Sequence, residues 1–131
     1  MFMEMNYDIE IKKECEIMIV RISGCLNNTT VVELIDAIQK TQDRKKNYHR
    51  LYDLTQVELE ITIKDFDFVL SHAWEKFNVA GVEHRVAFVA QDEFTLMLLD
   101  LYKTQSRKYA FHYVEYFENE SDAIQWLQET D

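Results

Sequence analysis

The sequence predicts an α/β protein in which an N-terminal hairpin leads into repeated strand–helix units. Three observations lead to this prediction. Near the N-terminus, apolar and polar residues alternate over short segments, as they do in strands. Further along, short apolar segments take turns with longer ones whose apolar residues recur every three or four positions, as on one face of a helix. Residues 84–90, "HRVAFVA", form an almost unbroken apolar run, which is typical of a strand buried on both faces of a parallel sheet.

Length and composition favour a single domain over residues 1–131. A chain of 131 residues has a common domain size, and 47% hydrophobic residues supply enough apolar surface for one core. Two glycines and no proline leave little room for a flexible linker or for a glycine-rich loop that cradles phosphate. We therefore expect no cofactor.

Net charge and cysteine content limit which partners and which cellular compartment we expect. A net charge of −10 repels phosphate backbones, so no nucleic-acid partner is expected. The longest apolar run, "LMLLDLY", is far too short to span a bilayer. The two cysteines lack CxxC spacing, and the start, "MFMEMNYDIE", lacks the apolar segment of a secretory signal. These features predict a cytoplasmic protein with reduced thiols and no integral membrane segment.

Two strands and a helix open the chain. Residues 7–12 alternate in polarity, residues 16–23 are rich in Ile and Val, and the polar link between them predicts a hairpin. Gly24 is expected to end the second strand. Residues 27–44 predict a helix whose start holds the two residues of a capping box, Thr30 and Glu33. Its buried stripe would consist of Val31, Leu34, Ile35 and Ile38.

The next strand and helix bring the first candidate site. Residues 48–54 predict a third strand, which ends at an acid, Asp53. A second helix is expected from Thr62, where Asp65 resembles the acid of a capping box, and Gly81 is expected to follow its end. The buried face of this helix would consist of Ile63, Phe66, Leu70, Ala73 and Phe77.

The rest of the chain repeats the strand–helix pattern. Asp92 stands at the N-cap position of a helix over residues 93–108, whose stripe would be Phe94, Met97, Leu98, Leu101 and Tyr102. Residues 113–117 predict the last strand, and Asn119 is expected to cap a final helix that turns Ala123, Ile124 and Leu127 inward. Together the elements predict a mostly parallel sheet of about five strands flanked by four helices, with right-handed crossovers.

Residues that could carry catalysis are present but do not form a recognisable set. Three of the four histidines stand at or just before a strand start, the opposite end from the usual binding crevice: His49, His84 and His112. His72 and Glu75 could share a helix face, but two ligands alone do not make a zinc site. Cys25 is the better placed thiol, yet no base can be assigned to it. The phosphate-loop, dinucleotide and hydrolase motifs are missing, so we expect no enzyme activity.

Asp53 invites comparison with the phosphorylated acid of receiver domains. That chemistry needs a metal held by further acids at the end of the first parallel strand, and here that strand ends "RISGCLNN". The sequence therefore argues against a receiver. Asp53 is expected to hydrogen-bond the following turn, and its surroundings are where a crevice forms in a parallel sheet.

Four segments give the chain a familiar pattern: "VRISGCL" at 20–26, "HRLYDLTQV" at 49–57, "HRVAFVAQDE" at 84–93 and "VEYFENESDAIQWL" at 114–127. With these segments the chain resembles the SpoIIAA-like family, within the broader STAS (anti-sigma-factor antagonist) fold group. The resemblance covers nearly the whole chain. It implies a βα superhelix, and regulatory, interaction or ligand-binding roles rather than a shared enzyme activity.

One departure bears on function. In the antagonist branch, a strand ending in an Asp-Leu-Ser-like motif leads to an Asp-Ser-Ser-Gly helix start, where a serine is phosphorylated. Asp53-Leu54-Thr55 resembles the first part, but "EITIKD" replaces the second. Ile63 stands near the phosphoacceptor position, and Thr62 is the nearest hydroxyl. This departure argues against a kinase switch of the antagonist type, with phosphorylation of Thr62 kept as an extension.

Two functional hypotheses follow. The first is a non-catalytic regulatory or protein-interaction domain whose candidate ligand or partner surface contains Asp53, Thr55, Thr62 and Asp92. The second is a protein that binds a small apolar ligand such as a lipid, because aromatic residues are abundant on or near the helices. Phe68 and Trp74 stand off the main stripe of their helix, so we expect them to be exposed and to form part of a homodimer interface.

Overall fold

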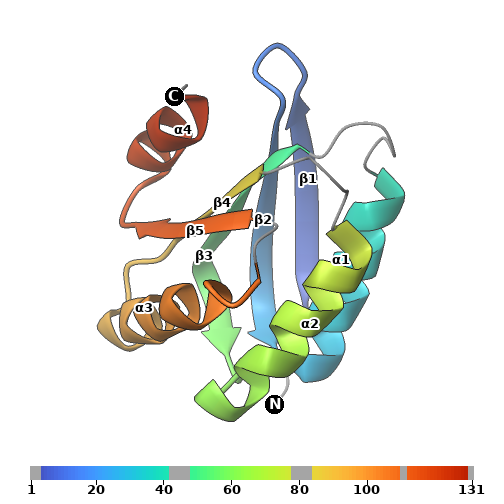
Figure 1. Cartoon of the computed structure of the whole chain (residues 1–131), viewed down its shortest axis with the longest axis vertical. Coiled ribbons are helices and arrows are strands. Elements are labelled where there is room, and N and C mark those ends of the chain that lie inside the picture. The colour runs from blue at the N-terminus through green and yellow to red at the C-terminus, as the bar shows by residue number, and fades with distance from the viewer. Residues whose placement is uncertain (1–3, 42–47, 78–83, 110–111, 130–131) are drawn as a thin grey trace.

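The computed structural model describes residues 4–41, 48–77, 84–109 and 112–129, and in them helices cover both faces of one five-stranded sheet (Figure 1). The strands are β1 (Asn6–Lys12), β2 (Ile17–Leu26), β3 (His49–Leu59), β4 (His84–Val89) and β5 (His112–Phe117). The helices are α1 (Asn28–Thr41), α2 (Phe66–Phe77), α3 (Glu93–Ser106) and α4 (Glu120–Gln128), with a 3-10 turn η1 (Ile63–Asp65). Strand order follows chain order; β1 and β2 are antiparallel and the other pairs are parallel. The predicted α/β class and opening hairpin are confirmed.

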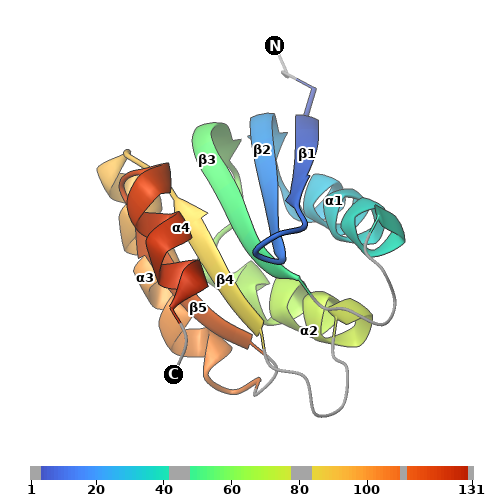
Figure 2. The same ribbon diagram turned by 90° about the horizontal axis from the view of Figure 1, so that it is seen from above.

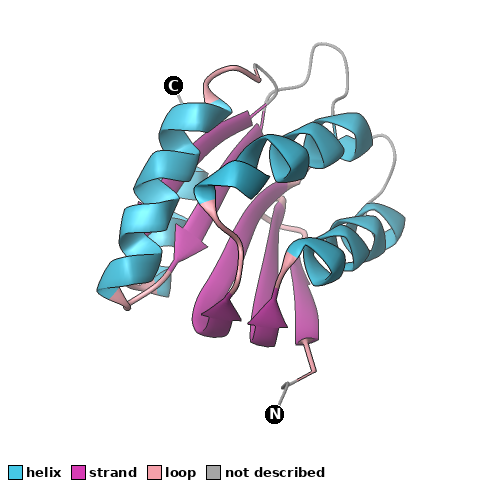
Figure 3. Cartoon of the chain, turned by 90° about the horizontal axis from the view of Figure 1, so that it is seen from below, coloured by secondary structure: helices cyan, strands magenta, loops and turns pink. Residues whose placement is uncertain are grey.

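The helices divide unequally between the two faces. When neighbouring parallel strands follow one another in the chain and every crossover is right-handed, the connecting helices lie on the same face of the sheet. Helices α1, α2 and α3 accordingly share one core with the sheet. Helix α4 packs against the other face, over β3, β4 and β5 (Figures 2 and 3). Its buried residues there are Ala123 and Leu127, as predicted, with Ile124 half-buried.

A buried cation lies in the larger core. Arg50 on β3 is 1% exposed, and its Nε donates to the Tyr52 hydroxyl at 2.9 Å. Its Nη2 lies 2.8 Å from Nε2 of the equally buried His84. Because arginine only donates, this contact makes Nε2 of His84 the acceptor. The guanidinium carbon lies 3.9 Å from the centroid of the Phe77 ring, which adds a cation–π contact.

Two element boundaries near the N-terminus differ from the prediction. Strand β2 continues through Gly24 to Leu26, because Gly24 adopts φ +92° and the chain can bend there without ending the strand. Helix α1 begins earlier than the expected capping box of Thr30 and Glu33, which was wrong. Asn27 is the cap: its side chain accepts from the backbone N–H of Thr29 and Thr30, and the Thr30 hydroxyl accepts from the Asn27 N–H.

Strand β3 is longer than predicted and contains a bulge. It runs to Leu59 rather than stopping near Asp53, so the expected strand end was wrong. Arg21 on β2 pairs with Asp53 on β3. From this pair onward, two residues of β2 lie opposite three residues of β3, so β3 contains one extra residue. Before the bulge, Tyr52 and Leu54 face the larger core; after it, Val57 and Leu59 do. The bulge therefore reverses the alternation along the strand.

The predicted apolar stripes hold for α1 and only in part for the next two helices. All four predicted residues of α1 are buried. In the second helix, Ile63 is exposed and Val69 takes its place in the core. In α3, the buried residues are Thr95, Leu98, Leu99 and Ser106, whereas Phe94, Met97 and Leu101 are exposed. The stripe prediction was wrong for these exposed residues. The expected helix end at Gly81 lies outside the described residues.

Candidate functional site

Asp53 lies beside the β3 bulge on the sheet face that α4 partly covers. Its Oδ1 accepts from the backbone N–H of Thr55 at 2.9 Å and from the Thr55 hydroxyl at 2.7 Å, so Asp53 stabilises the bulge rather than a turn after the strand. Asp53 also lines a shallow groove of ≈ 330 Å³, together with Asn6, Tyr7, Asp8, Arg21, Ile22, Ser23 and Gln56. We call this the polar groove.

The cation of the polar groove is engaged by carboxylates. Arg21 donates to Glu10 at 2.8 Å and to Glu120 at 2.9 Å, and so links β2 to β1 and to α4. The hydrogen bond to Arg21 lowers the pKa of Glu10. Since Asp8 and Asp53 add two further acids to the lining, the groove does not favour an anionic ligand.

Thr62 lies in a different depression, which we call the apolar groove. It lies between the β3–η1 segment and α3, has a volume of ≈ 720 Å³, and is lined by Leu59, Glu60, Ile61, Thr62, Ile63, Lys64, Phe94, Met97 and Leu98. The Thr62 backbone N–H donates to Oδ2 of Asp65 at 3.0 Å, which is the carboxylate half of the predicted capping box. The Thr62 hydroxyl donates to the same oxygen at 3.0 Å. These bonds and one from Asn28 lower the pKa of Asp65, the backbone bond most.

Asp92 holds the start of α3. Its Oδ2 accepts from the backbone N–H of Thr95 at 2.9 Å and from the Thr95 hydroxyl at 3.1 Å, which confirms the predicted N-cap. The four candidate surface residues therefore do not form one site. Asp53 and Thr55 meet at the bulge, Thr62 lines the apolar groove, and Asp92 positions the helix that forms one wall of that groove.

Sequence reasoning missed the exposed side chains around the apolar groove. Phe94 is 59% exposed and Met97 and Ile63 are each 52% exposed, and Leu101 follows Met97 one turn later on α3. The signal was present in the sequence: α3 carries more apolar residues than one helix face can bury. Leu98, Leu99 and Tyr102 already fill the inward side, so a second apolar face points outward. We call Phe94, Met97 and Leu101 the α3 stripe.

The titratable residues that were considered for catalysis are buried or make structural hydrogen bonds. Burial raises the pKa of the Cys25 thiol, with Glu60 as the next cause, so the reactive thiolate is disfavoured. Nδ1 of His49 accepts from the backbone N–H of Arg85 at 2.8 Å, and His72 pairs with Asp36 at 3.1 Å. Over the described ranges, no three His, Cys, Asp or Glu side chains are grouped so that they could hold a metal ion.

Phe68 and Trp74 are exposed, as predicted, at 51% and 45%. Both lie on α2, six residues apart, so they project about 120° apart around the helix axis at 100° per residue. Their part in a homodimer interface stays a prediction.

A protein-family model described as SpoIIAA-like matches residues 17–128, which is most of the chain. The chain belongs to the SpoIIAA-like family. Two solved structures, each 18% identical to this domain, share its fold. An anti-sigma factor antagonist from Mycobacterium paratuberculosis aligns with a TM-score of 0.61 over 96% of both chains. An uncharacterised protein with a SpoIIAA-like fold from Shewanella loihica aligns with a TM-score of 0.58 over 94% of this chain and 93% of its own.

At this identity the two structures support the fold and not a shared activity. No curated protein matches the SpoIIAA-like chain. None of the helices that the structure describes is long and apolar enough to cross a membrane.

Proposed function

We propose that this SpoIIAA-like domain is a non-catalytic protein-interaction domain, and that its partner binds at the apolar groove beside Thr62. The observation that carries the proposal is the exposed apolar surface formed by Ile63, Phe94 and Met97 around an open groove. A contiguous exposed apolar surface lowers the solubility of a protein, and such surfaces are typical of interaction sites. The titratable groups described above act in caps, a bulge and ion pairs, which favours binding over catalysis.

The proposed interaction does not use the phosphoserine switch of the antagonist branch. The resemblance to the antagonist branch implies that Ile63 stands near the position of its phosphoacceptor serine. The hydroxyls of Thr55 and Thr62 already donate to the carboxylates of Asp53 and Asp65. A phosphate on either threonine would face a carboxylate at hydrogen-bond distance, so repulsion would oppose the modification. We therefore expect intact-mass spectrometry of the native protein to find both threonines unmodified.

A position-specific crosslink in cells tests the proposed surface. A photoreactive amino acid at Met97 should yield a covalent adduct with one protein, because this residue lines the groove and is half exposed. The same probe at Gln39, an exposed position on α1, is the control. Adducts at neither position, or equal adducts at both, would contradict the proposal.

Binding of a small apolar ligand is the second candidate, and the interior cavities bear on it. Among the residues that the structure describes, two cavities lie between the sheet and helices α1–α3, and each measures ≈ 70 Å³. Ligand pockets usually measure about 300–1,000 Å³, so a lipid would need the helices to move apart. Native mass spectrometry after gentle purification tests this candidate, and a co-purifying lipid would reverse the order of the two proposals.

A further inference from the structure

We propose that the apolar groove takes a basic amphipathic helix of a partner protein. This inference rests on the proposed function and adds the chemistry of the partner. It combines three properties of the described residues: the spacing of the exposed apolar side chains, the shape of the groove and the sign of the charge around it.

The spacing of the α3 stripe suits a helical partner. Phe94, Met97 and Leu101 stand at i, i+3 and i+7, so they fall within about 60° of arc on α3 at 100° per residue. They span about 10 Å along the helix, or two turns. A helix that lies in a groove presents apolar anchors with the same spacing. Two turns of such a helix match the length of the stripe.

The groove offers an apolar floor beneath that stripe. Leu59, Ile61 and Leu98 line both the open groove and the interior cavity below it. Ile63 stands opposite α3 and is half exposed. An anchor side chain of the partner can therefore reach an apolar floor, while the rest of its helix stays at the surface. The open form of the groove suits a helix, whose backbone groups are bonded internally.

Acidic residues stand in and beside the groove. Glu60 lines it, and Glu93, the first residue of α3, is exposed next to Phe94. Lys64 is the basic residue in the lining. The whole chain carries a net charge of −10, which extends the same sign beyond the groove. Cationic side chains beside the apolar anchors would complement these acidic residues.

The same charges disfavour two other occupants. A second copy of this chain, docked stripe to stripe, would bring together two chains that each carry a net charge of −10, and like charges across an interface are costly. A membrane surface with anionic lipids would be repelled by the same acidic charge. A protein segment that carries both apolar and cationic residues meets both requirements of the groove.

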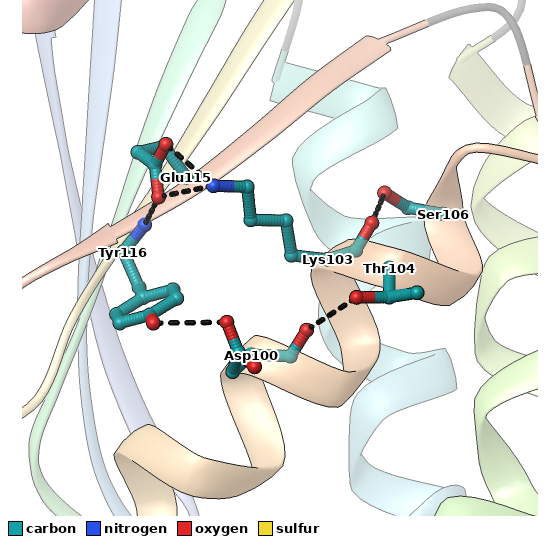
Figure 4. A network of polar contacts seen from close by, with 6 residues as sticks. All are labelled: Asp100, Lys103, Thr104, Ser106, Glu115 and Tyr116. Carbon is teal, nitrogen blue, oxygen red and sulfur yellow. Dashed lines mark hydrogen bonds and ion pairs between the residues drawn. The ribbon is translucent and has the colours of Figure 1, made fainter.

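Side-chain contacts hold the α3 wall against β5 (Figure 4). Lys103 donates to both carboxylate oxygens of Glu115 at 2.8 and 3.0 Å, and the Tyr116 hydroxyl donates to Asp100 at 2.9 Å. Anchoring at two successive turns keeps the stripe in place before a partner arrives. A preformed wall loses little conformational entropy on binding.

Designed peptides test the inference. A fluorescent peptide of about four turns, roughly 14 residues, would carry leucines at spacings of three and four and lysines on its other face. We expect it to bind, and Phe94→Ser with Met97→Ser to weaken binding about tenfold or more, as loss of anchor contacts does. Glu93→Lys should weaken binding several-fold and reduce its salt dependence.

Matched controls keep the test specific. A scrambled peptide of the same composition, without an apolar face, should bind far more weakly. Trp74→Ser removes an exposed aromatic elsewhere, and Glu33→Lys makes the same charge change on α1; both variants should bind the peptide as the natural chain does. Equal binding of the scrambled peptide, or equal loss in Glu33→Lys, would overturn the inference.

The two proposals can fail separately. If the Met97 crosslink captures a partner through an acidic or extended segment, the inference of a basic helix is wrong while the proposed function stands. If Met97 yields no specific adduct, the proposed function fails. Binding of the designed peptide would then show only that the groove accepts an artificial ligand. A partner segment that is helical and basic, with apolar residues facing Met97, would support both.

Discussion

At the scale of single residues, the buried Arg50 has more influence on stability than any candidate site residue. Its guanidinium supplies donors to Tyr52 and His84 in the larger core. A buried acceptor that loses its donor costs roughly 1–3 kcal/mol. We therefore expect Arg50→Met to lower the free energy of unfolding by roughly 2–5 kcal/mol. Urea denaturation measures this loss, with exposed Arg107→Met as control; equal stability of the two variants would contradict the account.

His49 makes stability depend on pH. Burial, followed by the charges of Arg85 and Arg50, lowers the pKa of His49 against the opposing effect of Glu16. The unfolded chain then binds a proton more readily than the folded one. Stability from this group is therefore complete above about pH 6.5, the ordinary histidine value, and is lost as pH falls through the lower folded-state pKa.

A variant isolates this contribution. His49→Gln removes the titrating ring, so its unfolding free energy should fall less than that of the natural chain between about pH 7 and pH 5. Chemical denaturation at several pH values checks the difference in slope. Parallel slopes for the two proteins would assign the pH dependence to other groups.

At the scale of elements, Gly24 allows β2 to continue beneath the N-terminal segment. Its φ of +92° is one that L side chains rarely adopt, and a Cβ there would overlap the carbonyl oxygen of Glu4. Gly24→Ala should cost roughly 1–3 kcal/mol from the backbone conformation alone. Thermal unfolding measures the change, and Ser23→Ala, at the neighbouring position, is the control. A variant as stable as the control would show that this bend relaxes freely.

The sequence was sufficient to predict element types and order but not which apolar face of α3 is buried. The spacing of apolar residues that marks a strand or a helix is a local property of the chain, so it predicts the element type correctly. The choice between Phe94 and Leu99 as a core residue depends on how the helix rotates against the sheet, which is a tertiary property. The strand end was misplaced at Asp53 for a similar reason, since an acid within a strand can stabilise a bulge as well as mark an end.

At the scale of the whole molecule, the outer surface of α2 is the candidate for self-association. Phe68 and Trp74 remain the predicted homodimer interface, separate from the α3 stripe. If they form it, light scattering at high concentration will report a dimer, and Phe68→Ser with Trp74→Ser will convert it to a monomer that keeps its circular dichroism spectrum. A natural chain that stays monomeric at high concentration refutes this interface.

The candidate site was harder to predict than the fold. Thr62 and Asp92 follow the carboxyl ends of β3 and β4, as the general rule for parallel sheets requires, whereas Asp53 and Thr55 lie within β3. The rule does not say which way any of these side chains face. The β3 bulge directs Asp53 to the polar groove, while the link to η1 carries Thr62 to the apolar groove. Short-range hydrogen bonds to Thr55 and Thr95 engage Asp53 and Asp92.

The extra residue in β3 also affects how related chains should be compared. Even-numbered positions contribute Tyr52 and Leu54 to the larger core, whereas odd-numbered positions contribute Val57 and Leu59. A homologue without the bulge would need one residue fewer to present the same inward side chains. An alignment that places a one-residue gap near Thr55 is therefore physically reasonable, and an ungapped one would compare core positions with surface positions over the last third of the strand.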